Sequence, residues 1–158
     1  MKQEKKLTYE QTKEKALRLL DFRSHSEAEL KKKLEAAGGT EIDSVLDFCR
    51  EYKLLNDEVY AKRLASDLAN LKKFGRRRIK DELFARGIDS ELVENAMADL
   101  EFDESIELLP LMEKKLKNNF EKKNVDKAIR YFLYRGYGFS DINKCIEQLK
   151  QNGEEYGI

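Results

Sequence analysis

The sequence predicts an all-α protein built from three tandem three-helix repeats. It has one proline and eight glycines, and 39% of its residues are charged, which is typical of helices with solvated outer faces. A pattern of helix cap, two apolar anchors and glycine stop occurs three times, with each position 49 residues from its counterpart in the next copy. Since every part of the pattern follows one period, we expect the three units to stack into an elongated, curved molecule.

The middle copy shows the pattern most clearly. Gly75 can serve as an N-cap, and Gly87 fits the position after the helix end, where a positive φ costs glycine nothing. Ile79 and Leu83 lie one turn apart on a face that must meet another helix. The equivalent positions in the outer copies are Ser26, Leu30, Leu34 and Gly38, and Asn124, Ala128, Phe132 and Gly136.

The first repeat is predicted over residues 8–55, after a disordered tail of residues 1–7. A helix over 8–22 leads through a turn to Ser26, which opens a second helix with Glu29 three residues later, as in a capping box. Gly38 and Gly39 end that helix. The third helix, over about 41–52, is expected to bury Val45, Phe48, Cys49 and Tyr52.

The second repeat is predicted over residues 56–102. Asn56 or Asp57 can cap its first helix, which reaches about Lys73. The helix between Gly75 and Gly87 follows, and a third helix begins near Asp89. The apolar positions expected inside are Tyr60, Leu64, Leu68 and Leu71, and then Val93, Ala96, Met97 and Leu100.

The third repeat is predicted over residues 103–150, followed by a disordered tail of residues 151–158. Pro110 interrupts a stretch from Asp103 to Phe120 that otherwise has a helical pattern. Either a helix begins at Pro110 or one is kinked there, and we favour a short turn before Pro110. The last helix should end near Lys150. Its expected core positions are Ile142, Cys145, Ile146 and Leu149.

The residues offer little to support catalysis or metal binding. The single histidine, His25, falls in a polar turn that we expect to be exposed, and the two cysteines lie on apolar helix faces. No phosphate-binding loop is present. We therefore expect no enzyme activity, metal or cofactor. No apolar run approaches the roughly 18 residues of a membrane span, and the N-terminus lacks a signal-peptide core, so a cytoplasmic protein is expected.

The formal net charge is zero, but the charges are segregated along the chain. Residues 72–80 hold six basic side chains and no acid, whereas residues 89–107 hold eight acids and no base. Three arginines in the first turn of a helix oppose its dipole, and arginine forks match phosphate oxygens. We therefore predict that this patch binds phosphate or an acidic partner.

The predicted filament- or nucleic-acid-binding residues are Lys72, Lys73, Arg76, Arg77, Arg78, Lys80, Lys122, Lys123 and Arg130. A second basic run, Lys114 to Lys123, is diluted by Glu113 and Glu121, and a solvated helix face explains it equally well. Tyrosines near Arg130 and Arg135 could stack on bases. Tyrosines at helical spacing are more often core, and we expect core positions for Tyr131, Tyr134 and Tyr137.

Four stretches carry a further pattern through their order and spacing. They are Arg23-Ser24-His25-Ser26-Glu27-Ala28-Glu29-Leu30 with Leu34; Leu55-Asn56-Asp57-Glu58-Val59-Tyr60-Ala61; Gly75-Arg76-Arg77-Arg78-Ile79 with Leu83 and Gly87-Ile88; and Arg135-Gly136-Tyr137 with Phe139-Ser140 and Ile142. Together they resemble the signatures of the RecX family, bacterial regulators of the recombinase RecA, over about residues 9–150. His25 departs from the pattern, since the family more often carries arginine there.

The resemblance implies three tandem three-helix repeats in a curved molecule without a catalytic site. It also implies binding in the groove of the RecA–single-stranded DNA filament, with inhibition of recombinase, ATPase and coprotease activities in DNA repair, DNA recombination and the SOS response. We expect a monomer with no membrane partner.

Two other function classes fit the residues. One is a free-standing DNA-binding protein of helix-turn-helix type, with the helix after Gly75 as its recognition helix. Ile79 and Leu83 leave little of that helix to enter a groove, and zero net charge is unusual for a dedicated DNA binder. The other is a helical scaffold that binds only protein, against which only the arginine cluster and the family resemblance argue.

Overall fold

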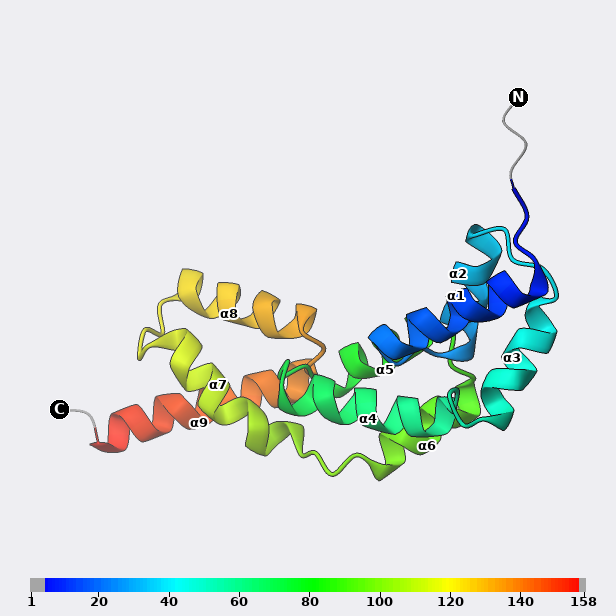
Figure 1. The fold of residues 1–158 in the computed structure, drawn as a ribbon. Coiled ribbons are helices and arrows are strands. Elements are labelled where there is room, and N and C mark those ends of the chain that lie inside the picture. The colour runs from blue at the N-terminus through cyan, green and yellow to red at the C-terminus, as the bar shows by residue number, and fades with distance from the viewer. Residues whose placement is uncertain (1–4, 157–158) are drawn as a thin grey trace. The chain divides into compact units, whose positions relative to one another are not determined.

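The computed structural model describes residues 5–156, which form nine α-helices and no β-strand (Figure 1). The helices are α1 (Tyr9–Phe22), α2 (Glu27–Ala36), α3 (Ile42–Glu51), α4 (Asp57–Asn70), α5 (Arg76–Ala85), α6 (Ser90–Asp99), α7 (Glu104–Leu116), α8 (Lys122–Tyr134) and α9 (Phe139–Tyr156). The predicted all-α fold is confirmed. Among these helices none is long and apolar enough to cross a membrane.

The chain forms two compact units, each assembled from two stretches of sequence. Within the described part of the chain, the first unit comprises residues 5–64 and 83–96, and the second comprises residues 65–82 and 97–156. Inside the first unit, the buried cluster consists of Ala16, Leu30, Leu34, Val45, Leu46, Cys49 and Leu55. Inside the second, it consists of Leu108, Met112, Leu116, Ala128, Phe132, Tyr137, Ile142, Cys145 and Ile146. The division into consecutive repeats at residues 55 and 102 stays a prediction.

The helix boundaries follow the cap and stop signals closely. Ser26 accepts a hydrogen bond from the Glu29 backbone, and the Glu29 side chain accepts one from the Ser26 backbone at 3.1 Å, which completes the predicted capping box. Asn56 caps α4, because its side-chain oxygen accepts a hydrogen bond from the Val59 N–H at 3.1 Å. The three predicted glycine stops all have positive φ: 78° at Gly38, 73° at Gly87 and 97° at Gly136. Local backbone chemistry therefore sets most of the helix ends.

The buried face differs from prediction on two helices. Tyr52 and Leu71 were expected inside, but they are 63% and 76% exposed. On α3, Leu46 is buried instead of Tyr52. On α4, small side chains at every fourth position are buried: Ala61, Ala65 and Ala69. Of the larger residues expected inside, Leu68 is buried as predicted, and Tyr60 and Leu64 are half-buried.

The prediction of a turn before Pro110 is wrong, because α7 runs through the proline. Asp103 caps the helix from its start, accepting a bond from the Ser105 N–H at 3.0 Å. Pro110 removes one bond to the carbonyl of Ile106. Both residues are exposed, on the side of the helix where water can solvate that carbonyl.

Asn124 is also displaced from its predicted role. The helix starts earlier, with Glu121 as N-cap, so Asn124 lies inside α8. Its amide donates to the carbonyls of Leu116 at 3.1 Å and Asn119 at 2.7 Å. The residue therefore satisfies the end of α7 instead of the start of α8.

The described parts of both predicted tails, residues 5–7 and 151–156, are more ordered than expected. Leu7 donates its N–H to the Gly38 carbonyl at 2.9 Å and accepts from Thr40 Oγ1 at 2.8 Å, which fixes part of the expected tail 1–7. The last helix was expected to end near Lys150, but α9 continues to Tyr156. Its extension packs beside α7, and Asn152 and Gly153 line a hollow together with Leu109 of α7. Residues 1–4 and 157–158 of the predicted tails lie outside the described residues.

Replacing Pro110 by alanine should stabilise the protein. Alanine restores a donor for the Ile106 carbonyl and removes the ring clash, which we expect to raise the free energy of unfolding by about 1–3 kcal/mol. Urea denaturation measures the change. Glu113→Ala, an exposed substitution on the same helix, should stay within about 0.5 kcal/mol of the unchanged protein. A Pro110→Ala variant that unfolds more easily would contradict this assignment of α7.

His25 should titrate below its ordinary range. The prediction of an exposed turn residue is wrong: the side chain is 2% exposed, with Nδ1 at 2.9 Å from the Arg23 carbonyl and Nε2 at 2.8 Å from Lys33 Nζ. Burial lowers the pKa of His25, and the charges of Arg23 and Lys33 lower it further. Because the folded pKa lies below the unfolded value of about 6.5, this group stabilises the fold fully above that pH, and the contribution is lost as pH falls through the folded pKa.

His25 is the sole histidine, so a proton NMR titration of its imidazole is unambiguous. A midpoint clearly below about 6.5 is expected. A midpoint at or above that value would show that burial and the charges of Arg23 and Lys33 do not hold the ring neutral.

Candidate nucleic-acid interface

The start of α5 meets the end of α8 inside the second unit. The Gly75 N–H donates to the Arg135 carbonyl at 2.8 Å, and the Arg77 N–H donates to the Gly136 carbonyl at 3.2 Å. A Cβ at Gly75 would lie 2.5 Å from the Gly136 carbonyl, and one at Gly136 would lie 2.3 Å from the Arg78 backbone. Only glycine fits at either place. We call the contact between residues 75–78 and 133–137 the α5–α8 junction.

Arg76 is directed into the protein. Its guanidinium donates to three carbonyls at and beyond the end of α6: Met97 at 3.2 Å, Leu100 at 3.1 Å and Phe102 at 2.7 Å. Its backbone N–H donates to the Glu104 carboxylate at 2.6 Å. The side chain therefore joins the connection between α6 and α7 to the start of α5.

Arg77 and Arg78 both contact the end of α8. Arg77 Nη2 donates to the Leu133 carbonyl at 2.8 Å, and Arg78 Nη1 donates to the Tyr134 carbonyl at 3.2 Å. Arg78 also pairs with Glu82 at 3.0 Å. These cations oppose the dipole of α5 but match the C-terminal dipole of α8, a partner that the local sequence pattern does not reveal. Arg77 remains exposed, and Arg78 is half-buried.

Lys72 and Lys73 follow α4, and their backbone is held by α8 and the residues after it. The Arg135 guanidinium donates to the Lys72 carbonyl, and the Tyr137 hydroxyl donates to the Lys73 carbonyl at 2.8 Å. Tyr137 is fully buried, as predicted, and burial raises its pKa to about 12. The side chains of Lys72 and Lys73 are exposed. Their backbone is thus fixed while their ammonium groups face solvent.

These lysines border a groove that the sequence did not reveal. It has a volume of about 480 Å³. Its lining residues are Leu71, Lys72, Lys73, Leu111, Lys114, Lys115, Lys117, Tyr131, Phe132 and Arg135. Six of these are cationic and none is acidic. We call this surface the basic groove.

An exposed aromatic ring lies among the cations of the basic groove. Lys115 Nζ is 3.9 Å from the centroid of the Tyr131 ring, and the Arg135 guanidinium is 5.4 Å from it. Tyr131 is 40% exposed and Tyr134 is 75% exposed, so the prediction of core positions for these two was wrong. The signals that could have found the groove were the basic run beginning at Lys114 and the arginine before Gly136.

The remaining predicted site residues lie apart from the groove or contribute differently. Lys122 and Lys123 are exposed in the first turn of α8, which places Lys122 about 20 Å along the helix from Arg135. Arg130 is exposed on the same helix, and Lys80 is half-buried on α5. The structure therefore gathers Lys72 and Lys73 with lysines of α7, and not with the start of α8.

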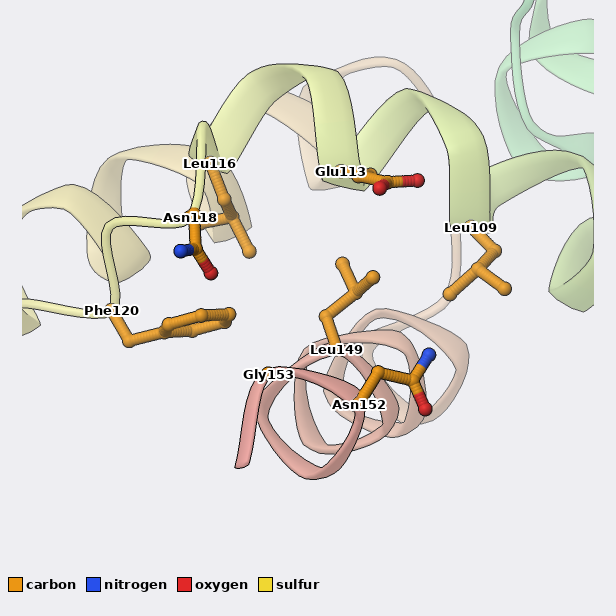
Figure 2. Close-up of a pocket in the computed structure, with 8 residues that line it drawn as sticks. All are labelled: Leu109, Glu113, Leu116, Asn118, Phe120, Leu149, Asn152 and Gly153. Carbon is orange, nitrogen blue, oxygen red and sulfur yellow. The ribbon is translucent and has the colours of Figure 1, made fainter. Parts of the chain in front are cut away.

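A second hollow in the same unit has a different character (Figure 2). Leu109, Leu116, Phe120 and Leu149 line it together with Glu113, two asparagines and a glycine, around a volume of about 400 Å³. It carries no lysine or arginine, so it does not fit a phosphate group.

The described residues contain no group of three or more histidine, cysteine or acidic side chains that could hold a metal ion. Cys49 and Cys145 are buried, and burial raises the pKa of both thiols. Buried protonated thiols are poor nucleophiles. The second unit therefore offers cationic side chains that can bind anions.

Comparison with known proteins identifies related chains. Family models for the first and second three-helix domains of RecX match residues 13–49 and 56–97. The regulatory protein RecX of Clostridioides difficile strain 630 is 32% identical, over 95% of this chain and 73% of that protein. The one from Vibrio vulnificus strain CMCP6 is 35% identical, over 85% of this chain and 90% of that protein.

A crystal structure of RecX from Lactobacillus salivarius shares the fold. It has a TM-score of 0.76 at 23% identity, covering 90% of this chain and 97% of that one. The two matched domain ranges follow each other along the chain and contain three-helix domains. The predicted tandem arrangement of helices is confirmed.

Arg76 should contribute to stability. Arg76→Ala removes a side-chain donor from the carbonyls of Met97, Leu100 and Phe102, which we expect to cost about 1–3 kcal/mol. Lys72→Ala removes an exposed lysine of the neighbouring loop and should change stability by less than about 0.5 kcal/mol. Thermal or urea unfolding compares the two. Equal stability of both variants would place Arg76 among the solvent-facing cations after all.

Proposed function

The chain belongs to the RecX family, and we propose that it is a non-enzymatic regulator that binds the RecA–single-stranded DNA filament. Binding lowers the recombinase, ATPase and coprotease activities of the filament. The protein acts as a monomer in the cytoplasm, in DNA repair, DNA recombination and the SOS response. No cofactor is needed for this role.

The observation that carries the proposal, beside family membership, is the basic groove on a protein of zero net charge. A recombinase filament presents phosphates and protein side chains together. Six cations gathered without an acid suit the phosphates. The acid-rich stretch of residues 89–107 suits basic side chains on the recombinase.

The structure weakens the case for a free-standing helix-turn-helix protein. A recognition helix presents its N-terminal residues to the major groove of DNA. In α5 that end is bonded to α8 through Gly75 and Arg77, and the Ile79 and Leu83 side chains are fully buried. Little of α5 is left to read base edges. A scaffold that binds only protein remains the alternative that experiment must separate.

Purified protein added to RecA on single-stranded DNA should lower the rate of ATP hydrolysis in a dose-dependent manner. RecA-stimulated self-cleavage of a repressor substrate should fall in parallel, because both activities need an intact filament. The protein alone, incubated with ATP and DNA, serves as the control and should show no hydrolysis. Unchanged RecA ATPase at a concentration where co-sedimentation shows saturated binding would refute the inhibitory role.

A further inference from the structure

We propose that the basic groove binds the sugar–phosphate backbone of single-stranded nucleic acid, with Tyr131 as the surface on which one base stacks. The inference deepens the proposed function and rests on it for its biological setting. Its test uses bare DNA, so the two can fail separately. None of the groove's lysines of α7, nor Arg135 or Tyr131, belongs to the site predicted from the sequence.

The groove concentrates positive charge from segments far apart in the sequence. Lys72 and Lys73 follow α4, Lys114, Lys115 and Lys117 come from the end of α7, and Arg135 follows α8. Some exposed cations elsewhere on the protein pair with an acid of the same helix, as Arg18 does with Glu14. In the groove the lining side chains include no carboxylate, so the like charges are best neutralised by a polyanion.

Two of these lysines occupy backbone positions that favour glycine. Lys73 has φ of 57° and lies in the loop after α4, and Lys117 has φ of 52° and is the C-cap of α7. A lysine near a helix C-terminus gains from the helix dipole, which explains part of the choice. Lys53 has the same conformation at φ 59° but lies outside the groove, so the conformation is not itself a sign of binding. It provides a matched control.

Tyr131 gives the groove a second property that a nucleic acid can use. Its ring packs edge-on against Phe132, with centroids 5.0 Å apart and an interplanar angle of 89°, so it is supported from within. Its partial exposure leaves aromatic surface between Lys115 and Arg135. A base stacked there would have its flanking phosphates beside lysines, which is the arrangement found in proteins that bind single strands without sequence preference.

An acidic peptide fits the same residues less well. The groove has five lysines and one arginine, and that arginine already donates to the Lys72 carbonyl. Both residue types pair with carboxylate as well as with phosphate, so the choice between the two partners depends on the aromatic ring. The exposed aromatic ring is of no use to a carboxylate. The residues therefore favour single-stranded nucleic acid over an acidic protein segment.

The test is fluorescence anisotropy of a labelled oligodeoxythymidine titrated with the full chain at several salt concentrations. The variant Lys73→Gly/Lys117→Gly removes two groove charges while placing glycine where the backbone favours it, so the fold should be retained or stabilised. It should weaken binding severalfold and flatten the log–log salt dependence by about 1.4, or about 0.7 for each phosphate deprived of its lysine. Lys53→Gly makes the same substitution outside the groove and should leave both quantities unchanged.

Tyr131→Leu tests the stacking surface. It should lower affinity about tenfold without altering the salt slope, because it removes no charge. If Lys53→Gly lowered the affinity for DNA as much per removed charge as the groove variant does, the effect would be one of net charge. That result would overturn the proposal. An unchanged salt slope in the groove variant, with polyglutamate competing fully for the wild type, would overturn it in favour of an acidic protein partner.

The readouts also separate this inference from the proposed function. Loss of bare-DNA binding in the groove variant, with no effect of wild-type protein on RecA ATPase, would support the groove and reject the regulatory role. Normal bare-DNA binding by the groove variant, with intact inhibition of RecA, would reject the groove and support the regulatory role.

Discussion

The second unit depends on the close approach of two helix ends. Gly75 and Gly136 let the start of α5 and the end of α8 touch through their backbones, and the N–H groups of one helix bond to the carbonyls of the other. Each end has groups that its own helix cannot satisfy, and the two dipole ends that meet have opposite sign. Arg77 and Arg78 reinforce the junction by donating to the last carbonyls of α8. A side chain at either glycine would force these backbones apart.

The basic residues near this junction have two different roles, one structural and one in the basic groove. Arginine side chains carry several donors in a fixed plane, and here they bind backbone carbonyls at the ends of α6 and α8. Lysines have a single compact charge on a flexible stem, and here they surround the groove. A run of basic residues in a sequence therefore contains both structural and binding groups. Which is which depends on carbonyls contributed by distant segments.

The sequence predicted well those features that are decided within a few residues. The capping box at Ser26, the glycine stops and the buried anchors Ile79 and Leu83 are all present. It failed where a partner comes from elsewhere in the chain. Arg76 donates to carbonyls more than twenty residues away in the sequence. Asn124 donates to the carbonyl of Leu116, at the end of the preceding helix. For Pro110, the outcome depended on which side of α7 faces solvent, which the local pattern leaves open.

The same division is consistent with our proposal that this neutral protein binds a polyanion through the basic groove. At the α5–α8 junction the guanidinium groups donate directly to carbonyls at 2.8 and 3.2 Å, over distances far below a Debye length. Most lysines of the basic groove face solvent, where salt screens their attraction to a phosphate that they do not contact directly. Residues 72–78 contribute both to the α5–α8 junction and to the basic groove, and the two should respond differently to salt. If the groove binds nucleic acid as proposed, raising the salt concentration weakens that binding, because the counterions displaced from the phosphates gain less entropy at high salt, whereas the α5–α8 junction persists. Because the net charge is zero, the rest of the protein adds no general attraction to DNA, so any affinity for DNA must come from the groove.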